Sequence, residues 1–267
     1  MSDLNIVLLQ TDIAWEDKQQ NVTLLENDYF IHLKPNTFDL LLLPEMFLTG
    51  FTMKTQTFYE EMDGKAIKWL KKWAKKLNCQ IGGSLIIKEE SNFYNRFVIV
   101  SEKGVETYYD KAHLFRMGDE NHHFTKGQNR VVHQIKGWRI LLQVCYDLRF
   151  PVFSRNRNID NNKEYDVMLY VANWPKIRSH IWTNLLQARA IENQAYCIGV
   201  NRVGVDGNNV EHSGDSMAVS PWGQVMYKAL PNQRDIQLIH LKREVLNDIK
   251  AKFPAYLDAD NFELRLK

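Results

Sequence analysis

The sequence of 267 residues lacks the features that mark exported or membrane-bound proteins. Its three cysteines, Cys79, Cys145 and Cys197, are odd in number and too widely spaced for a disulfide framework. No apolar run is long enough to span a bilayer. The first residues, MSDLNIVLLQTD, have no basic lead and are more typical of a buried strand than of a signal peptide. We therefore expect reduced thiols, a cytoplasmic protein and no membrane partner.

An excess of charge of one sign is also lacking. The chain has 34 basic and 32 acidic residues, a formal net charge of +2, so no nucleic-acid partner is expected. Lysines cluster along Lys65–Lys76, opposite an apolar helical stripe, which is typical of a solvated face. No linker rich in proline, glycine or serine divides the chain. Residues 1–267 are predicted to form a single domain, with the polar end, 256–267, as a surface or dimer-contacting arm.

Short apolar runs alternate with amphipathic stretches along the chain. The runs predict strands at Leu4–Gln10, Asp39–Leu43, Cys79–Ile87, Asn92–Ser101, Val105–Tyr109, Arg139–Val144, Tyr165–Ala172, Ala195–Asn201, Ser216–Val219, Gln224–Tyr227 and Asp235–Leu241. Helical spacing predicts helices at Lys18–Leu33, Lys65–Leu77, Ser179–Asn193 and Lys242–Lys252, the third with Ile181, Leu185, Ala188 and Ile191 inward. This order predicts an α/β fold of mixed sheets covered by helices, a four-layer α-β-β-α sandwich.

Several apolar strands end abruptly in reactive side chains. LLLLPE ends in Glu45, ILLQVCYD ends in Cys145 and Asp147, and Lys111 follows the strand Val105–Tyr109. Sites in α/β proteins gather at the carboxyl ends of strands, where the rigid sheet meets adaptable loops. Taken singly, however, the cysteine is more typical of a small buried hydrophobe, and a helix cap and a surface charge are the default interpretations of the glutamate and the lysine. The pattern alone leaves these alternatives open.

The segments around these residues resemble the nitrilase superfamily, the carbon–nitrogen hydrolases. They follow the family's order from about residue 4 to residue 241 and read LLLLPEMFLTGF, YYDKAHLF, VCYDLRFP, LYVANWP, LLQARAIENQAYCIGVNRVG and SGDSMAVSPWG. One such segment is a modest signal, but all six in order are very specific. The resemblance implies an α-β-β-α sandwich and a cysteine hydrolase with a Glu–Lys–Cys triad.

In that triad Cys145 is the nucleophile and Glu45 the base that takes its proton, since an unassisted thiol is mostly protonated at neutral pH. Lys111 and the backbone N–H of Tyr146 are expected to stabilise the oxyanion. The loop RMGDENHHFTKG contains Glu120, which matches a second glutamate of the family and would orient Lys111 or the substrate amide.

Neighbouring polar residues are given other roles. Asp147 and Arg149 are predicted to fix geometry beside the nucleophile rather than to transfer protons. The adjacent pair His122 and His123 lacks the spacing that aims two imidazoles at one ion, and no further ligands complete a site. Neither a metal nor a cofactor is expected.

Finer resemblance concerns the substrate. EMFLTGFTM together with HLFRMGDENHHF is similar to the omega-amidase branch, which implies terminal amides of 2-oxo dicarboxylic acids, such as 2-oxoglutaramate and 2-oxosuccinamate, as substrates. Their free carboxylate requires a cationic or multi-donor clamp, for which Arg116 and Arg202 are candidates. For each arginine a surface or dimer salt bridge is an equally good interpretation. Phe115, Trp174 and Tyr146 are expected as walls of the pocket.

Rival hypotheses remain within and outside this class. Another amidase, nitrilase or carbamoylase would share the triad but differ in its pocket. A non-catalytic scaffold of the same fold, or an acyltransferase that uses an amine in place of water, are further alternatives. The resemblance also implies a homodimer or larger assembly, with the helix Ser179–Asn193 and the carboxyl-terminal arm as candidates for the contact surface.

Overall fold

The protein is built around two mixed β-sheets. The computed structural model describes residues 2–159, 161–260 and 262–265, and within them each sheet has six strands. The first sheet has the order β16-β1-β2-β3-β4-β5. Its strands are β1 Leu4–Gln10, β2 Leu40–Leu42, β3 Gln80–Glu89, β4 Asn92–Ser101, β5 Gly104–Asp110 and β16 Asp235–Leu241. The strand β16 pairs antiparallel with β1, so the last strand of the sequence closes one edge of the first sheet.

The second sheet has the order β15-β14-β11-β10-β7-β6. Its strands are β6 Val132–Ile135, β7 Trp138–Val144, β10 Val167–Ala172, β11 Tyr196–Asn201, β14 Met217–Val219 and β15 Val225–Lys228. The central strands β7, β10 and β11 run parallel, and every residue of β10 and β11 is buried. Strands covered on both faces need no polar alternation, which is why these segments are nearly continuous apolar runs.

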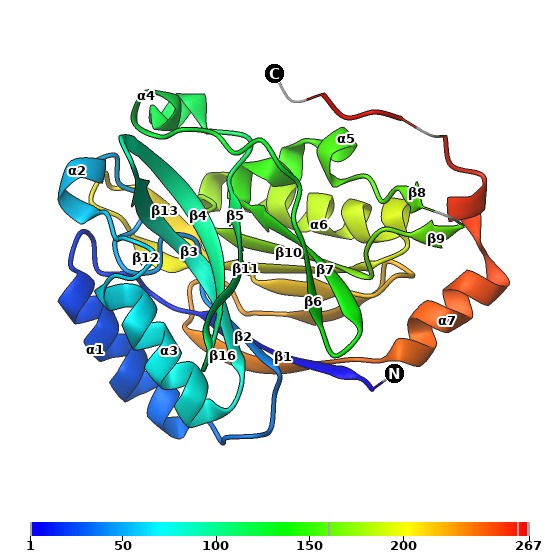
Figure 1. The fold of residues 1–267 in the computed structure, drawn as a ribbon, viewed down its shortest axis with the longest axis horizontal. Helices are drawn as coiled ribbons and strands as arrows, with labels where there is room; N and C mark the ends of the chain where they lie inside the picture. Colours follow the sequence, from blue (N-terminus) through cyan, green and yellow to red (C-terminus); the bar gives the residue numbers. More distant parts are fainter. Residues whose placement is uncertain (1, 160, 261, 266–267) are drawn as a thin grey trace.

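The two sheets pack face to face and carry helices on their outer faces (Figure 1). One buried cluster joins side chains of both sheets, including Leu42 of β2 and Leu142 of β7. The outer face of the first sheet is covered by α1 Lys18–Asp28 and α3 Lys65–Leu77, which Glu26 links through hydrogen bonds from two tryptophans of α3. The outer face of the second sheet is covered by α6 Ser179–Asn193. The predicted four-layer α-β-β-α sandwich is thereby confirmed.

The helix α6 turns a different face to the sheet than its sequence suggested. Its bounds are as predicted, but Trp182, Leu186 and Ala190 are buried, whereas Ile191 is 54% exposed. The cause is the glycine of β11 beneath the helix: a Cβ on Gly199 would lie 2.5 Å from the ring of Trp182. The large side chain of Trp182 fits over this glycine. The apolar stripe that was predicted to face the sheet therefore lies on the flank of the helix.

Element boundaries differ from the predictions by a few residues, with one larger change. The expected helix Lys18–Leu33 ends at Asp28 because Tyr29 leaves the helical region with a φ of −131°, and a short 3-10 helix, Phe30–His32, follows. The sequence patterns missed several short elements: α2 Thr55–Phe58, α4 Glu120–His123, α5 Pro151–Ser154, β6 Val132–Ile135, β8 Asn158–Ile159, β9 Asn162–Lys163, β12 Val203–Val205 and β13 Glu211–Ser213.

The end of the chain lies against the second sheet. The helix α7 Arg243–Lys252 is followed by the 3-10 helix η5 Ala255–Leu257, in which Tyr256 is buried, and Leu264 packs against the cluster between the sheets. The predicted arm, 256–267, therefore includes buried contacts, and its residues 261 and 266–267 lie outside the described part. Among the described helices, none combines the length and apolarity needed to cross a membrane.

Candidate active site

Strand ends from both sheets meet around one cavity. Glu45 follows β2 and Lys111 follows β5 in the first sheet, while Cys145 and Asn173 follow β7 and β10 in the second. All four line a cavity of about 540 Å³. The packing of the two sheets therefore brings together side chains that are far apart in sequence, as the strand-end pattern predicted.

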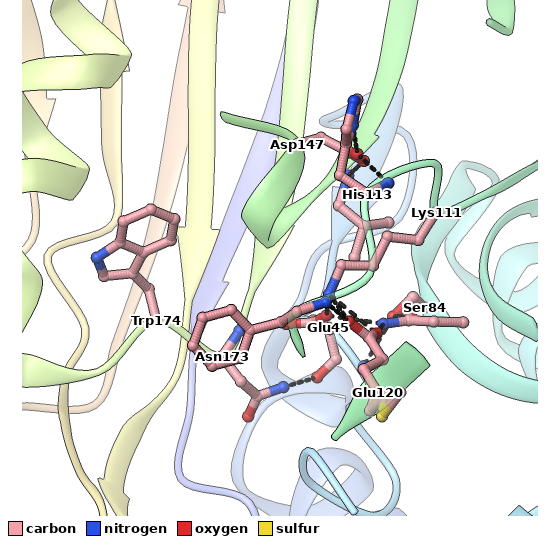
Figure 2. Close-up of polar contacts among 12 residues, drawn as sticks. Glu45, Ser84, Lys111, His113, Glu120, Asp147, Asn173 and Trp174 are labelled. Atoms are coloured by element: carbon pink, nitrogen blue, oxygen red, sulfur yellow. Dashed lines mark hydrogen bonds and ion pairs between the residues drawn. The ribbon is translucent and has the colours of Figure 1, made fainter. Parts of the chain in front are cut away.

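An ion network with no solvent exposure lies at the inner end of the cavity. The ammonium of Lys111 lies 2.9 Å from Glu45 Oε1 and 2.9 Å from Glu120 Oε2 (Figure 2). All three residues are 0% exposed. Removing three charges from water costs several kcal/mol per ion, and only close pairing with further hydrogen bonds offsets that cost.

Those further hydrogen bonds are present. Asn95 of β4 donates through Nδ2 to Glu45 Oε1 at 2.7 Å and to Glu120 Oε1 at 3.0 Å. Ser84 of β3 donates to Asn95 Oδ1 at 2.8 Å and so fixes the orientation of that amide. The backbone N–H of Asn173 donates to Glu45 Oε2 at 2.7 Å. Our sequence predictions missed Asn95 and Ser84, although a buried polar residue inside an apolar strand is a signal that could have identified both.

The electrostatics of the site follow from burial and from this pairing. Burial alone would lower the pKa of Lys111, but the carboxylates of Glu120 and Glu45 more than offset that effect, so the pKa lies above its usual value and the lysine is charged. Burial raises the pKa of Glu120. Burial, reinforced by the charge of Glu45, raises the pKa of the Cys145 thiol well above its usual value. The resting site therefore holds a thiol and an ionised lysine.

The backbone places Cys145 in an unusual conformation. Its φ is 43°, in the left-handed region that few residues other than glycine adopt, and it opens the 3-10 helix η3 Cys145–Arg149. Met46, directly after Glu45, has a φ of 44°. Both reactive residues are thus presented at sharp turns where a strand ends.

A buried carboxylate ties the turn of Cys145 to the loop of Lys111. Asp147 accepts the backbone N–H of Val144 at 2.9 Å, the backbone N–H of His113 at 3.0 Å and the hydroxyl of Tyr109 at 2.7 Å. The His113 ring lies 2.8 Å from the same carboxylate, a contact drawn in Figure 2. Tyr109 and His113 lie two residues before and two residues after Lys111, and Val144 directly precedes Cys145. Asp147 therefore sets the position of one residue relative to the other.

The structure distributes the predicted substrate-binding residues unevenly. Phe115, Tyr146 and Trp174 line the cavity, and the rings of Phe115 and Tyr146 meet edge to face at 5.1 Å. Arg116 is exposed and does not line the cavity. Arg202 is fully buried outside the cavity and is paired with Asp12 at 2.7 Å.

Other residues of the cavity were not predicted to contact a substrate. They include Phe51, Arg178 and His212, and also Arg149, which the sequence assigned to scaffolding. Burial lowers the pKa of His212 to about 4, so this histidine is neutral at pH 7. Of the pair considered as metal ligands, His122 lies on the surface beside Asp119.

Comparison with known proteins identifies the family. The family model described as Carbon-nitrogen hydrolase matches residues 6–251. The chain belongs to this family. It is similar to omega-amidase YafV of Escherichia coli K12, with 43% identity over 99% of this chain and 100% of that protein. It is also similar to 2-oxoglutaramate amidase of Bacillus subtilis, with 34% identity over 83% of this chain and 84% of that protein.

A solved structure is similar over the whole chain. The CN-hydrolase superfamily protein XC1258 from Xanthomonas campestris, whose active site carries an arsenic adduct, is 39% identical, with a TM-score of 0.95 over 99% of this chain and 100% of that one. The resemblance to the nitrilase superfamily is confirmed, and the protein is an enzyme, a hydrolase of carbon–nitrogen bonds other than peptide bonds.

The role of Asp147 can be tested by Asp147→Asn. An amide offers one acceptor oxygen to the N–H donors that the carboxylate now holds, so the loop of Lys111 and the turn of Cys145 should separate slightly. We expect kcat to fall by about 100-fold, the usual effect of a small misplacement, with little change in KM. Tyr109→Phe should cause a smaller loss because it removes one donor, and Tyr108→Phe, on the exposed side of β5, should cause none. An unchanged kcat in Asp147→Asn would contradict this role.

Proposed function

We propose that the protein hydrolyses the terminal amide of small 2-oxo dicarboxylic acid amides, such as 2-oxoglutaramate and 2-oxosuccinamate, and releases ammonia and the oxo acid. The observation that carries this proposal is that Cys145, Lys111 and Glu45 line the same cavity. The two relatives named as omega-amidase and 2-oxoglutaramate amidase support the substrate class. A cavity of about 540 Å³ suits a small linear substrate.

The first chemical step is transfer of the Cys145 proton to Glu45 as the sulfur attacks the amide carbon. The raised pKa of the thiol means that little thiolate exists beforehand, so the base must act during the attack. A carbon–sulfur bond forms, and the carbonyl electron pair becomes an oxyanion. Lys111 stabilises this charge together with the backbone N–H of Tyr146, which follows the nucleophile and lines the cavity.

The second half returns the site to its starting state. Glu45 passes its proton to the departing nitrogen, the carbon–nitrogen bond breaks, and ammonia leaves a thioester on Cys145. Glu45 then takes a proton from water as the water attacks the thioester, and it returns that proton to the Cys145 sulfur when the carbon–sulfur bond breaks, which releases the acid and restores the thiol. Glu120 keeps Lys111 in place throughout, since its carboxylate lies 2.9 Å from the ammonium and also accepts the N–H of Phe115 at 2.6 Å.

The function is tested by ammonia release from 2-oxoglutaramate, with acetonitrile and N-carbamoyl-β-alanine as rival substrates. We expect the oxo-acid amide to be turned over fastest. Cys145→Ala should lose turnover by at least about 10⁴-fold, because the thioester cannot form, and should retain the fold by circular dichroism. Cys197→Ala, which alters another buried thiol, is the matched control. Faster turnover of the nitrile or the carbamoyl amine would assign the protein to another activity of the family, and full activity in Cys145→Ala would refute the mechanism.

The pH dependence should reflect the buried carboxyl of Glu120. Because burial raises its pKa, Glu120 takes up a proton at a higher pH than an exposed glutamate does, and the ion pair with Lys111 is then lost. Activity should therefore fall as the pH is lowered through the raised pKa of Glu120. Raising the pH leaves Glu120 ionised, so this residue should cause no loss of activity at alkaline pH. In Glu120→Gln, kcat/KM should be lower and its acidic limb should move to lower pH. A pH–rate profile checks this, with the exposed Glu61→Gln as control, and identical acidic limbs would contradict it.

We also propose that the chain acts in the cytoplasm as a single catalytic domain that forms a homodimer through α6. The three cysteines are free, and unpaired thiols are typical of a reducing compartment. Ile191 of α6 is 54% exposed and lies beside Gly223, and the residues around that glycine in the sequence, Trp222, Val225 and Met226, are 42%, 48% and 41% exposed. Gln187 of α6 donates to the backbone oxygen of Gly223, so the helix and the turn that contains Gly223 form one surface. A two-fold axis would place that surface against itself.

Sedimentation velocity tests the dimer. The protein should sediment as a dimer at micromolar concentration, and the double variant Ile191→Asp/Val225→Asp should sediment as a monomer, because each interface would then hold like charges on an apolar surface. Ile31→Asp, which places the same charge on the exposed side of the first sheet's helices, should remain dimeric. A monomeric wild-type protein, or a dimer that survives the double variant, would overturn this assignment.

A further inference from the structure

Two arginines on the cavity wall have no charged partner among the described residues. Arg149 ends the 3-10 helix that begins at Cys145, and Arg178 ends the 3-10 helix η4 Lys176–Arg178, which follows β10. Both line the cavity and both are half-buried. Within the described part of the chain, no carboxylate lies within 4.0 Å of either guanidinium, and neither guanidinium donates a hydrogen bond.

The other charges of the cavity are already satisfied. Lys111 is held between Glu45 and Glu120, and Lys54 pairs with Glu16 at 2.7 Å. Asp206 accepts the backbone N–H groups of its own turn. What remains is a concentration of positive charge away from the ion network. The inner end, with two carboxyl groups around one lysine, offers no net attraction to an anion. An anionic group that enters the cavity is therefore drawn toward the two arginines.

Aromatic rings support both guanidinium groups without using their donors. Arg149 lies over the ring of Trp174, 5.3 Å from its centroid, and Arg178 lies over the ring of Phe115 at 5.6 Å. Trp174 also donates through Nε1 to the backbone oxygen of Arg178 at 2.8 Å, so one side chain contacts both arginines. A cation–π contact holds a guanidinium through its charge and requires no hydrogen bond from the N–H groups at its edge. The edge is the part that binds a carboxylate through paired hydrogen bonds.

We propose that Arg149 and Arg178, held by Trp174 and Phe115, form the subsite for the free carboxylate of the substrate. This inference rests on the proposed function and adds the residues that select 2-oxo acid amides over uncharged amides. The amide end then lies at Cys145 and the carboxylate end at the arginines. Arg202, which the sequence suggested for this role, is unsuitable because it is buried outside the cavity, where its Nε and Nη2 donate to Val203, Asp12 and Ile13.

The test compares two amides of equal chain length, 2-oxoglutaramate and pentanamide, which has neither the carboxylate nor the ketone. The measured quantity is the ratio of their kcat/KM values. In Arg149→Gln and in Arg178→Gln this ratio should fall by about 10- to 100-fold, the usual effect of losing a charge-assisted hydrogen bond. Arg178→Lys should retain part of the preference because the charge remains. Glutaramate, the five-carbon amide with a carboxylate but no ketone, should follow 2-oxoglutaramate and so separates the charge from the oxo group.

Lys176→Gln is the matched control, since Lys176 belongs to the same 3-10 helix but pairs with Glu211 on the surface. It removes one positive charge from this region and should leave the ratio unchanged. A preserved ratio in both arginine variants, or an equal fall in the control, would overturn the subsite while leaving the proposed function intact. A wild-type protein with no preference for 2-oxoglutaramate over pentanamide would instead overturn the proposed function, and the subsite with it. Thermal melting verifies that each variant is folded.

Discussion

The burial of Lys111 between Glu45 and Glu120 is the constraint on which the site depends. A lysine without solvent contact is tolerated only when it is paired, and here each partner also has another anchor. One oxygen of Glu45 accepts the backbone of Asn173, and one oxygen of Glu120 accepts the backbone of Phe115. The network therefore joins strand ends of both sheets with the loop that carries Phe115. Loss of the Lys111 charge would leave two buried carboxylates facing each other, so the lysine is the group that the other two depend on.

A second buried carboxylate has a different task. Asp147 accepts donors from the segments of Lys111 and Cys145 but does not line the cavity. It therefore fixes distances without contacting a bound substrate. This separation suits a mechanism in which the thiol stays protonated until a substrate is in place. The base, the nucleophile and the oxyanion donor must already be positioned when the proton moves, because a preorganised site pays no reorganisation cost at that moment.

Much of the fold could be predicted from the sequence because local patterns determine it. The apolar runs of β7, β10 and β11 are buried on both faces, and α3 buries the stripe that its spacing indicates. The proposed catalytic residues were equally accessible, since Lys111 and Cys145 directly follow strands and Glu45 lies three residues after β2. The face of α6 was not, because it depends on Gly199 in another element. Asn95 was missed for a related reason: its partners Glu45 and Glu120 are 50 and 25 residues away.

The arginines of the proposed subsite show why candidate substrate contacts are harder to predict than candidate catalytic residues. Nothing local distinguishes Arg202 from Arg178, and each follows a buried strand or the loop after it. The difference is in the partners: Asp12, two residues after β1, engages Arg202, whereas Arg178 lies over the ring of Phe115 and has no carboxylate partner in the described part of the chain. That outcome is decided by which distant segment arrives beside each guanidinium. A polar side chain becomes a ligand-binding group when the fold supports it and leaves its donors unused, and this property belongs to the assembled cavity rather than to any motif.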